Sequence, residues 1–224
     1  MTQLSLTLES PVDYSADAFL VTDCNRSAWD WLVAWPEQQP EVPFTLLLGP
    51  EKSGKTHLLS LWAARQNEAL SRPVLDWSAL DDALPSRGLF LADGLAVAPS
   101  LAVARLNRLF ASEGRLLMAL PSDPDPRQLY IADFASRLRR AYLVTLDRLD
   151  DALLPGLLLK GFADRQLRVD ADLIAFLTLR LPRDYAAVWR AVQRLDEAAL
   201  SAGRRVTIPL ARQVLALDAA EEAK

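Results

Sequence analysis

The residues best suited to chemistry lie in one segment, positions 49–56, which read Gly-Pro-Glu-Lys-Ser-Gly-Lys-Thr. This is the pattern G-x-x-x-x-G-K-T, whose glycines let backbone N–H groups curl around a phosphate. Lys55 supplies a positive charge for the β- and γ-phosphate oxygens, and the Thr56 hydroxyl suits the coordination shell of Mg²⁺. The segment therefore predicts a site for ADP or ATP with Mg²⁺.

A phosphate-binding loop must follow a buried strand and open a helix. The apolar run at 44–48 precedes the loop, and residues 56–62 read as an amphipathic helix, so the context fits. Asp93 ends a second apolar run, and an acid at the end of a neighbouring strand can hold Mg²⁺ through water. The alternative for Asp93 is an ordinary turn with Gly94.

The rest of the chain divides into two patterns. Short apolar segments alternate with helical segments up to residue 146, which predicts βαβ units around a parallel sheet. The expected strands there are 44–48, 73–77, 88–93, 115–120 and 141–146, with helices near 24–32 and at 100–112. Helical spacing then recurs at 149–163, 170–181, 184–202 and 209–217. We therefore predict an α/β nucleotide-binding core over 11–146 and an all-helical domain over 147–218, with frayed residues from Asp218.

Composition restricts the function classes. The 224 residues are 51% hydrophobic and 24% charged, with a net charge of −4 that argues against tight non-specific DNA binding. No apolar run approaches the ~20 residues of a membrane span. The single cysteine, Cys24, fits a reducing cytosol, and the N-terminus has no signal-peptide pattern. We expect a cytoplasmic protein with no membrane partner.

A P-loop α/β core followed by a small helical lid is the architecture of AAA+ nucleoside triphosphatases. Residues 133–138 (Asp-Phe-Ala-Ser-Arg-Leu) resemble the DnaA-family segment that carries an inter-subunit arginine finger, and residues 122–124 resemble that family's sensor-1 region. Residues 204–209 (Arg-Arg-Val-Thr-Ile-Pro) resemble the lid of the Hda branch, whose members inactivate the initiator after replication starts. The resemblance covers nearly the whole chain.

This resemblance implies roles for individual residues. Arg137 is expected to act as a finger on ATP bound to DnaA, although a surface role in a basic cluster with Arg139 and Arg140 stays open. Residues 17–21 and 25–28 are similar to the family's lead-in to the adenine pocket. We expect His57, beside the loop, to be structural rather than catalytic. The expected nucleotide-binding residues are Leu20, Val21, Asn25, Gly49, Pro50, Lys52, Ser53, Gly54, Lys55, Thr56, His57, Asp93 and Ser122, with Thr56 and Asp93 (through water) at the Mg²⁺.

Residues 3–8, Gln-Leu-Ser-Leu-Thr-Leu, resemble a peptide that binds the sliding clamp, the β subunit of DNA polymerase III. Such a peptide binds in an extended form, and Gln3, Leu4, Leu6 and Leu8 are the residues expected to contact the clamp. The alternating leucines alone fit an N-terminal edge strand equally well. Beside the other resemblances we favour a flexible clamp-binding peptide over 1–10. No helix-turn-helix domain follows the lid, so we expect the chain to reach DNA only indirectly.

Two positions depart from the family pattern. Gly94 stands where AAA+ ATPases usually carry a second acid that polarises the attacking water. Ala186 stands where the family's lid carries a nucleotide-sensing arginine; Arg183 and Arg190 lie within one helical turn. We therefore expect nucleotide binding with weak or absent hydrolysis.

Three functions remain open at this stage. The first is a regulator that docks on the DNA-loaded clamp and promotes hydrolysis of DnaA-bound ATP, which prevents over-initiation. The second is a stand-alone P-loop ATPase or kinase, which basal turnover without a partner would favour. The third is a clamp adaptor with no role in hydrolysis, for which Arg137 is dispensable. Self-association into a homo-oligomer is compatible with each.

Overall fold

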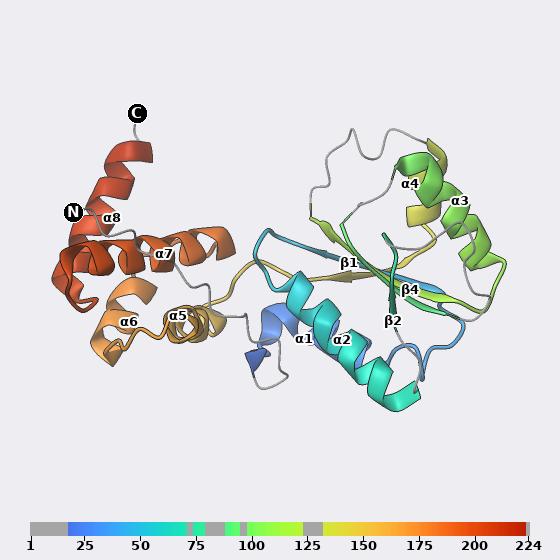
Figure 1. Ribbon diagram of the computed structural model, residues 1–224, viewed down its shortest axis with the longest axis horizontal. Helices are drawn as coiled ribbons and strands as arrows, with labels where there is room; N and C mark the ends of the chain where they lie inside the picture. The colour runs from blue at the N-terminus through green and yellow to red at the C-terminus, as the bar shows by residue number, and fades with distance from the viewer. Residues whose placement is uncertain (1–17, 71–73, 79–87, 95–97, 123–131, 223–224) are drawn as a thin grey trace, which may run out of the picture. The chain divides into compact units, whose positions relative to one another are not determined.

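The computed structural model describes residues 18–70, 74–78, 88–94, 98–122 and 132–222. The expected clamp-binding residues 3–8 lie outside this part of the chain. The described residues form two compact units, which divide between Arg148 and Leu149 (Figure 1). Residues 18–20 are grouped with the second unit.

The first unit is built on a parallel sheet with the strand order β2–β3–β4–β1–β5. Its strands are β1 (Phe44–Gly49), β2 (Val74–Asp76), β3 (Leu89–Asp93), β4 (Arg115–Pro121) and β5 (Tyr142–Thr145). All five predicted strands and their parallel arrangement are confirmed. Because β1 lies between β4 and β5, the loop after Gly49 emerges at the carboxyl ends of its neighbours, where α/β proteins bind ligands.

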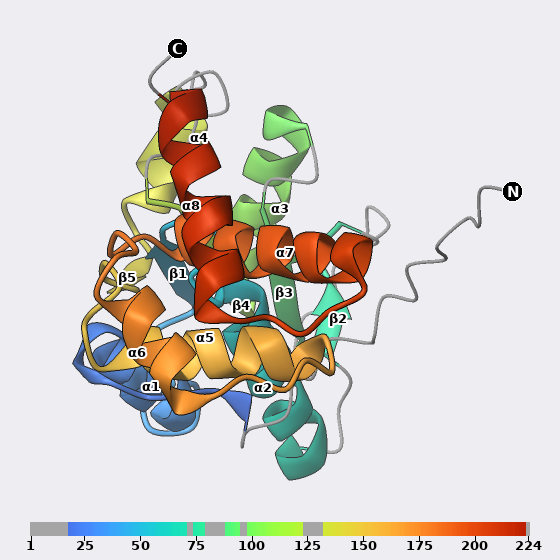
Figure 2. The same cartoon turned by 90° about the vertical axis from the view of Figure 1, so that its left-hand side faces the viewer.

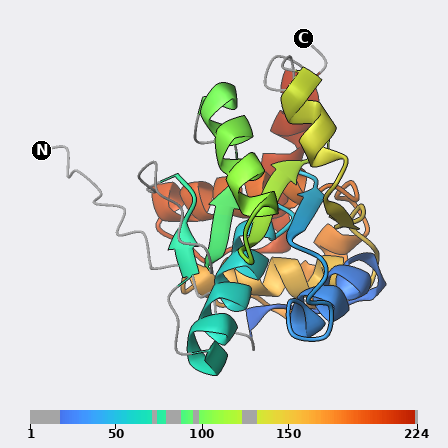
Figure 3. The ribbon, with the colours of Figure 1, turned by 90° about the vertical axis from the view of Figure 1, so that its right-hand side faces the viewer.

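Right-handed crossovers decide which face of the sheet each helix covers. Helix α2 (Lys55–Leu70) leads from β1 toward one end of the sheet, whereas α3 (Pro99–Phe110) and α4 (Ala132–Leu138) lead to strands in the opposite direction. Thus α3 and α4 cover one face, and α2 with α1 (Asp23–Ala34) covers the other (Figures 1 and 3).

The core beneath α3 and α4 fixes where the end of α4 lies. Phe134 of α4 is fully buried against this core, and such burial contributes about 2 kcal/mol. Alternate strand residues meet the two helices, as the pleat requires. The buried cluster comprises Phe44, Leu46, Trp77, Phe90, Ala92, Ala102, Leu106, Leu109, Leu116, Met118, Leu120 and Phe134.

The described residues of the second unit form four helices, as the sequence predicts: α5 (Leu153–Asp164), α6 (Ala171–Thr178), α7 (Tyr185–Ala202) and α8 (Ile208–Glu222) (Figure 2). Asp184 caps α7 by accepting a hydrogen bond from the Ala187 N–H at 2.7 Å, and Gly203 ends that helix. The expected fraying from Asp218 is wrong, because α8 continues to Glu222 through alanine and glutamate, both strong helix formers. Within the described ranges no helix has both the length and the apolar character needed to cross a membrane.

Candidate functional site

The phosphate-binding loop joins the end of β1 to the start of α2, the setting that the sequence predicts. A Cβ at Gly49 would lie 2.8 Å from Ser53 Oγ and 2.9 Å from Leu146 Cβ, so only glycine fits. Lys52 and Gly54 both have positive φ, at 62° and 94°. Alternation of right- and left-handed residues gathers successive N–H groups into an anion-binding concavity.

Ser53 gives a test of whether the loop suits a phosphate. Its side chain is buried, and Oγ has no hydrogen-bond partner among the described residues. Leaving a buried hydroxyl unsatisfied costs ~1–3 kcal/mol. A phosphate oxygen against the loop is a suitable partner, so the residues present fit a nucleotide phosphate.

Lys55 is held over the same loop. Its Nζ donates to the carbonyl oxygens of Gly49 at 3.0 Å and Pro50 at 2.7 Å. Burial lowers the pKa of this lysine, and the negative charges of Asp93 and Glu51 oppose that effect. The ammonium therefore lies in a partly desolvated position in which phosphate charge would favour its protonated form.

Thr56 and Asp93, the two predicted metal residues, lie together. The Thr56 hydroxyl donates to Asp93 Oδ2 at 2.6 Å, which links the first turn of α2 to the end of β3. A hydroxyl and a carboxylate are oxygen ligands of the kind that Mg²⁺ prefers. These two side chains would hold the ion beside the loop.

The position after Asp93 has a glycine-specific backbone. Gly94 has a φ of +82°, its N–H donates to the Ala119 carbonyl at 2.9 Å, and a Cβ placed on it would meet nothing within 4 Å. Crowding by a neighbour therefore does not account for the missing acid. The backbone itself disfavours a side chain at this point.

Two further predicted residues lie close to the loop in the fold. The Ser122 N–H, at the end of β4, donates to the Gly49 carbonyl at 3.0 Å. His57 lies in α2 and is only 8% exposed.

The expected adenine-pocket residues have local structural roles. Asn25 is buried in α1, and its Oδ1 accepts a hydrogen bond from the Thr22 N–H at 2.8 Å, which caps the helix. Val21 precedes this cap and is partly buried. Leu20 is grouped with the helical unit, where a Cβ at Gly156 of α5 would lie 2.4 Å from its Cδ1.

Arg137, in the last turn of α4, differs from its basic neighbours. Its Nε–H donates to Asn107 Oδ1 of α3 at 2.7 Å, and Nη1 donates to the Asp133 carbonyl at 2.7 Å. Arg140 instead places its guanidinium 4.0 Å from the centre of the Phe110 ring. No sequence pattern pointed to Asn107, because the contact appears only when the two helices pack together.

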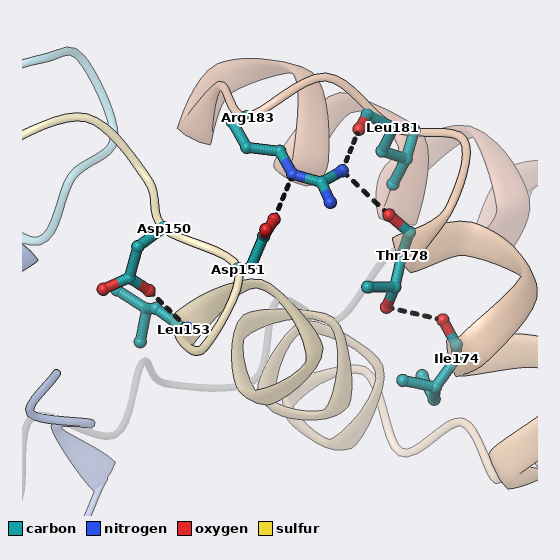
Figure 4. Close-up of polar contacts among 7 residues, drawn as sticks. All are labelled: Asp150, Asp151, Leu153, Ile174, Thr178, Leu181 and Arg183. Atoms are coloured by element: carbon teal, nitrogen blue, oxygen red, sulfur yellow. Dashed lines mark hydrogen bonds and ion pairs between the residues drawn. The ribbon is translucent and has the colours of Figure 1, made fainter.

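Arg183 fastens the loop before α7 to the start of α5 (Figure 4). Its Nε donates to Asp151 Oδ1 at 2.6 Å, and Nη1 donates to the carbonyls of Thr178 and Leu181, each at 2.9 Å. The guanidinium is therefore engaged within the helical unit. Ala186, in the first turn of α7, offers no cation.

The helical unit matches a known family. Residues 157–215 match the family model described as "Hda, lid domain". The chain is also 28% identical over 190 residues to an uncharacterized protein of Haemophilus influenzae. The aligned region covers 78% of this chain and 82% of that protein.

Solved structures of similar fold include DnaA replication initiation proteins and a Holliday junction branch migration motor. Domain III of the Thermotoga maritima replication initiation protein DnaA has a TM-score of 0.68 and 16% identity, covering 91% of this chain and 95% of that one. AMPPCP-bound DnaA from Aquifex aeolicus has a TM-score of 0.58 and 18% identity, covering 80% and 64%. The Thermotoga maritima RuvB branch migration motor has a TM-score of 0.59 and 13% identity, covering 84% and 67%. The chain has the AAA+ fold predicted from its sequence.

Proposed function

We propose that this chain, whose residues 157–215 match the Hda lid model and whose fold is similar to that of DnaA domain III, is a cytoplasmic regulator that inactivates DnaA. It promotes hydrolysis of the ATP bound to DnaA and so prevents over-initiation of replication. The observation that carries the proposal is the match of residues 157–215 to the Hda lid. A regulator with the initiator's own fold can pack beside it as one AAA+ subunit packs beside another.

Arg137 is the residue proposed to act on the partner. Its guanidinium lies at the end of α4 and would enter the ATP site of DnaA, where it would stabilise charge on the transferring phosphoryl group. An arginine supplied in trans accelerates such reactions by ~10³–10⁵. The geometry at Arg137 supports this role, because the bonds to Asn107 and to the Asp133 carbonyl hold the side chain but use only two of the five N–H donors of its guanidinium.

The chain's own loop is proposed to hold ADP or ATP as a structural ligand. The loop N–H groups, Ser53 and Lys55 would hold the phosphates, and Thr56 with Asp93 would hold Mg²⁺. The bound nucleotide supplies binding free energy, which stabilises the folded core. Gly94 provides no group to polarise water, so turnover of this nucleotide is expected to be slow.

Residues 3–8 are proposed to tether the chain to the DNA-loaded sliding clamp. A peptide that adds to the clamp's apolar groove raises the local concentration of Arg137 near DnaA bound to the same DNA. Contact with DNA is then indirect, which agrees with the net charge of −4.

The test is hydrolysis of ATP prebound to DnaA, measured with DNA-loaded clamp and this chain. Wild type is expected to accelerate hydrolysis, while Arg137→Ala and the double variant Leu6→Ala/Leu8→Ala lose the effect. Arg139→Ala removes an exposed arginine two residues further along and serves as the matched control, expected to act like wild type. If wild type binds the clamp without accelerating hydrolysis, the chain is a clamp adaptor instead.

A further inference from the structure

Two acceptors from different parts of the fold hold Arg137. Asn107 Oδ1, on α3, accepts from Nε, and the Asp133 carbonyl, one turn earlier on α4, accepts from Nη1, each at 2.7 Å. Helices α3 and α4 contact each other on one face of the sheet (Figure 3). Leu106 and Leu109 flank Asn107 in sequence and are fully buried, so the acceptor is attached to a rigid part of the core.

These contacts leave the terminal end of the guanidinium for another partner. A guanidinium carries five N–H donors, and the two bonds use the Nε–H and one of the Nη1 hydrogens. The other three hydrogens, on Nη1 and Nη2, make no hydrogen bond to any described residue. The Asp133 carboxylate lies 3.7 Å from Nη1, too far for a hydrogen bond. The terminal pair of nitrogens is the edge that binds two phosphate oxygens at once.

Holding the guanidinium in place lowers the cost of using it in trans. An exposed arginine has several rotatable bonds, and their freedom would be lost when the side chain enters a partner's site. Arg137 has largely lost this freedom already, since its side chain is only 19% exposed and is fixed at two nitrogens. Small errors in the placement of such a group cost large factors in rate.

We infer that Asn107 is the positioning residue of the arginine finger: by accepting the Nε–H of Arg137, it aims the terminal edge of the guanidinium at the partner's phosphates. This inference rests on the proposed function, in which Arg137 acts on ATP held by DnaA. Asn107 itself touches no reacting atom.

The test compares two substitutions of similar size in the full chain. Asn107→Leu keeps the number and branching of the side-chain heavy atoms and removes the acceptor, whereas Asn107→Asp keeps an oxygen at the same place. The hydrolysis rate of DnaA-bound ATP is measured with loaded clamp over a range of concentrations of each variant. Asn107→Leu is expected to lower the maximal rate about 10-fold and to leave the half-saturating concentration within about 2-fold. Asn107→Asp is expected to stay within about 3-fold of wild type in both.

A double-mutant cycle separates positioning from packing. If Asn107 acts only through the finger, Asn107→Leu has no further effect on the rate in a chain that already carries Arg137→Ala. The unfolding midpoint of Asn107→Leu is expected to stay close to that of wild type, because Asn107 itself is exposed and only one hydrogen bond is lost.

Several results would overturn the inference. An unchanged maximal rate for Asn107→Leu means that the amide does not position the finger. A faster rate means that the contact restrains Arg137, and a shift in half-saturation alone means that Asn107 belongs to the docking surface. Failure of the proposed function looks different, since Arg137→Ala would then behave like wild type whatever residue stands at 107.

Discussion

The Thr56 hydroxyl and the Asp93 carboxylate are joined by a hydrogen bond of 2.6 Å between residues 37 positions apart in the chain. The bond ties α2, which begins after the phosphate-binding loop, to β3, which lies two places from β1 in the sheet. A hydroxyl that ligates Mg²⁺ directly and a carboxylate that binds the ion through water lie in adjacent coordination shells, so their side chains must be close together. The 2.6 Å bond places the two side chains close enough for both to serve the proposed Mg²⁺ site.

Replacing Thr56 with valine is expected to remove most of the contribution of Mg²⁺ to nucleotide affinity. Valine keeps the shape of threonine but has no oxygen, so the ion loses one ligand. We expect ADP affinity with Mg²⁺ to fall about 10-fold, or ~1.4 kcal/mol. Calorimetric titration with Mg²⁺ and with a chelator measures the difference.

Ser60→Ala is the control for this experiment. Ser60 lies one turn later on α2, and its hydroxyl donates to the Thr56 carbonyl at 2.9 Å. Its loss is expected to leave the Mg²⁺ effect intact. An equal loss of ADP affinity in chelator would show that the Thr56 hydroxyl serves the fold or the phosphate rather than the ion.

Binding of ADP is expected to weaken as the pH rises through the alkaline range. The pKa of Lys55 lies below its ordinary value of 10.5 because the group is partly buried. The negative charge of a bound phosphate raises the pKa of Lys55 again. At a pH where part of the free protein has a deprotonated Lys55, ADP binding therefore takes up a proton. The affinity therefore declines from a lower pH than an ordinary lysine would allow.

Proton uptake is measured by calorimetry at about pH 9 in buffers with different ionisation enthalpies. Lys55→Arg keeps a positive charge that does not titrate in this range, so its proton uptake is expected to be smaller than that of wild type. Lys160→Met removes a lysine of α5 in the helical unit, outside the loop, and should keep the wild-type uptake. Equal uptake in wild type and Lys55→Arg would exclude Lys55 as the titrating group.

Features carried by local pattern were predictable from the sequence. The loop at 49–56 and the strand before it follow from glycine positions and a continuous apolar run, which are local properties. The parallel sheet followed from the alternation of strands and helices. Asp93 was found because it ends a strand, and the sheet places the ends of parallel strands along one edge.

Contacts between distant residues were not predictable. Arg137 and Asn107 are 30 positions apart, and Arg183 and Asp151 are 32 apart. Each pair depends on how two helices or loops pack, and polar residues on an exposed helix face carry no periodic signal of their partner. The sequence identified Arg183 as near the missing lid arginine, but only the structure shows that its guanidinium is already engaged.

Arg183→Ala is expected to destabilise the helical unit without changing nucleotide affinity. The substitution removes the bond to Asp151 and leaves the Thr178 and Leu181 carbonyls without a charged donor. Both charged side chains are substantially exposed, at 40% and 80%, so we expect a loss of only about 1 kcal/mol in the free energy of unfolding. Urea denaturation measures this loss, and ADP titration should stay within about 3-fold of wild type.

The matched control is Arg205→Ala, which removes an exposed arginine before α8 in the same unit. Its effect on stability is expected to be within about 0.5 kcal/mol. A fall of 10-fold or more in ADP affinity for Arg183→Ala, with stability unchanged, would assign Arg183 to the nucleotide and overturn its structural role.

Substitution of Gly94 is expected to lower the stability of the protein because of its backbone conformation and not because of neighbouring atoms. With φ at +82° and nothing within 4 Å of the point where a Cβ would lie, a side chain meets no clash yet requires a conformation that L-residues disfavour. Gly94→Ala should therefore lower the free energy of unfolding by about 1–2 kcal/mol, and Gly94→Asn by less, since asparagine tolerates left-handed backbone better. Urea denaturation of wild type, Gly94→Ala and Gly94→Asn measures their free energies of unfolding.

The same strain bears on hydrolysis by this chain. A glutamate placed at position 94 must either carry that strain or turn the backbone and break the 2.9 Å bond from the Gly94 N–H to the Ala119 carbonyl. We therefore expect Gly94→Glu to be destabilised like Gly94→Ala and to gain little ATP turnover in a single-turnover assay. A stable Gly94→Glu variant with rapid turnover would show instead that the missing acid alone limits hydrolysis, and that the chain retains the rest of an ATPase site.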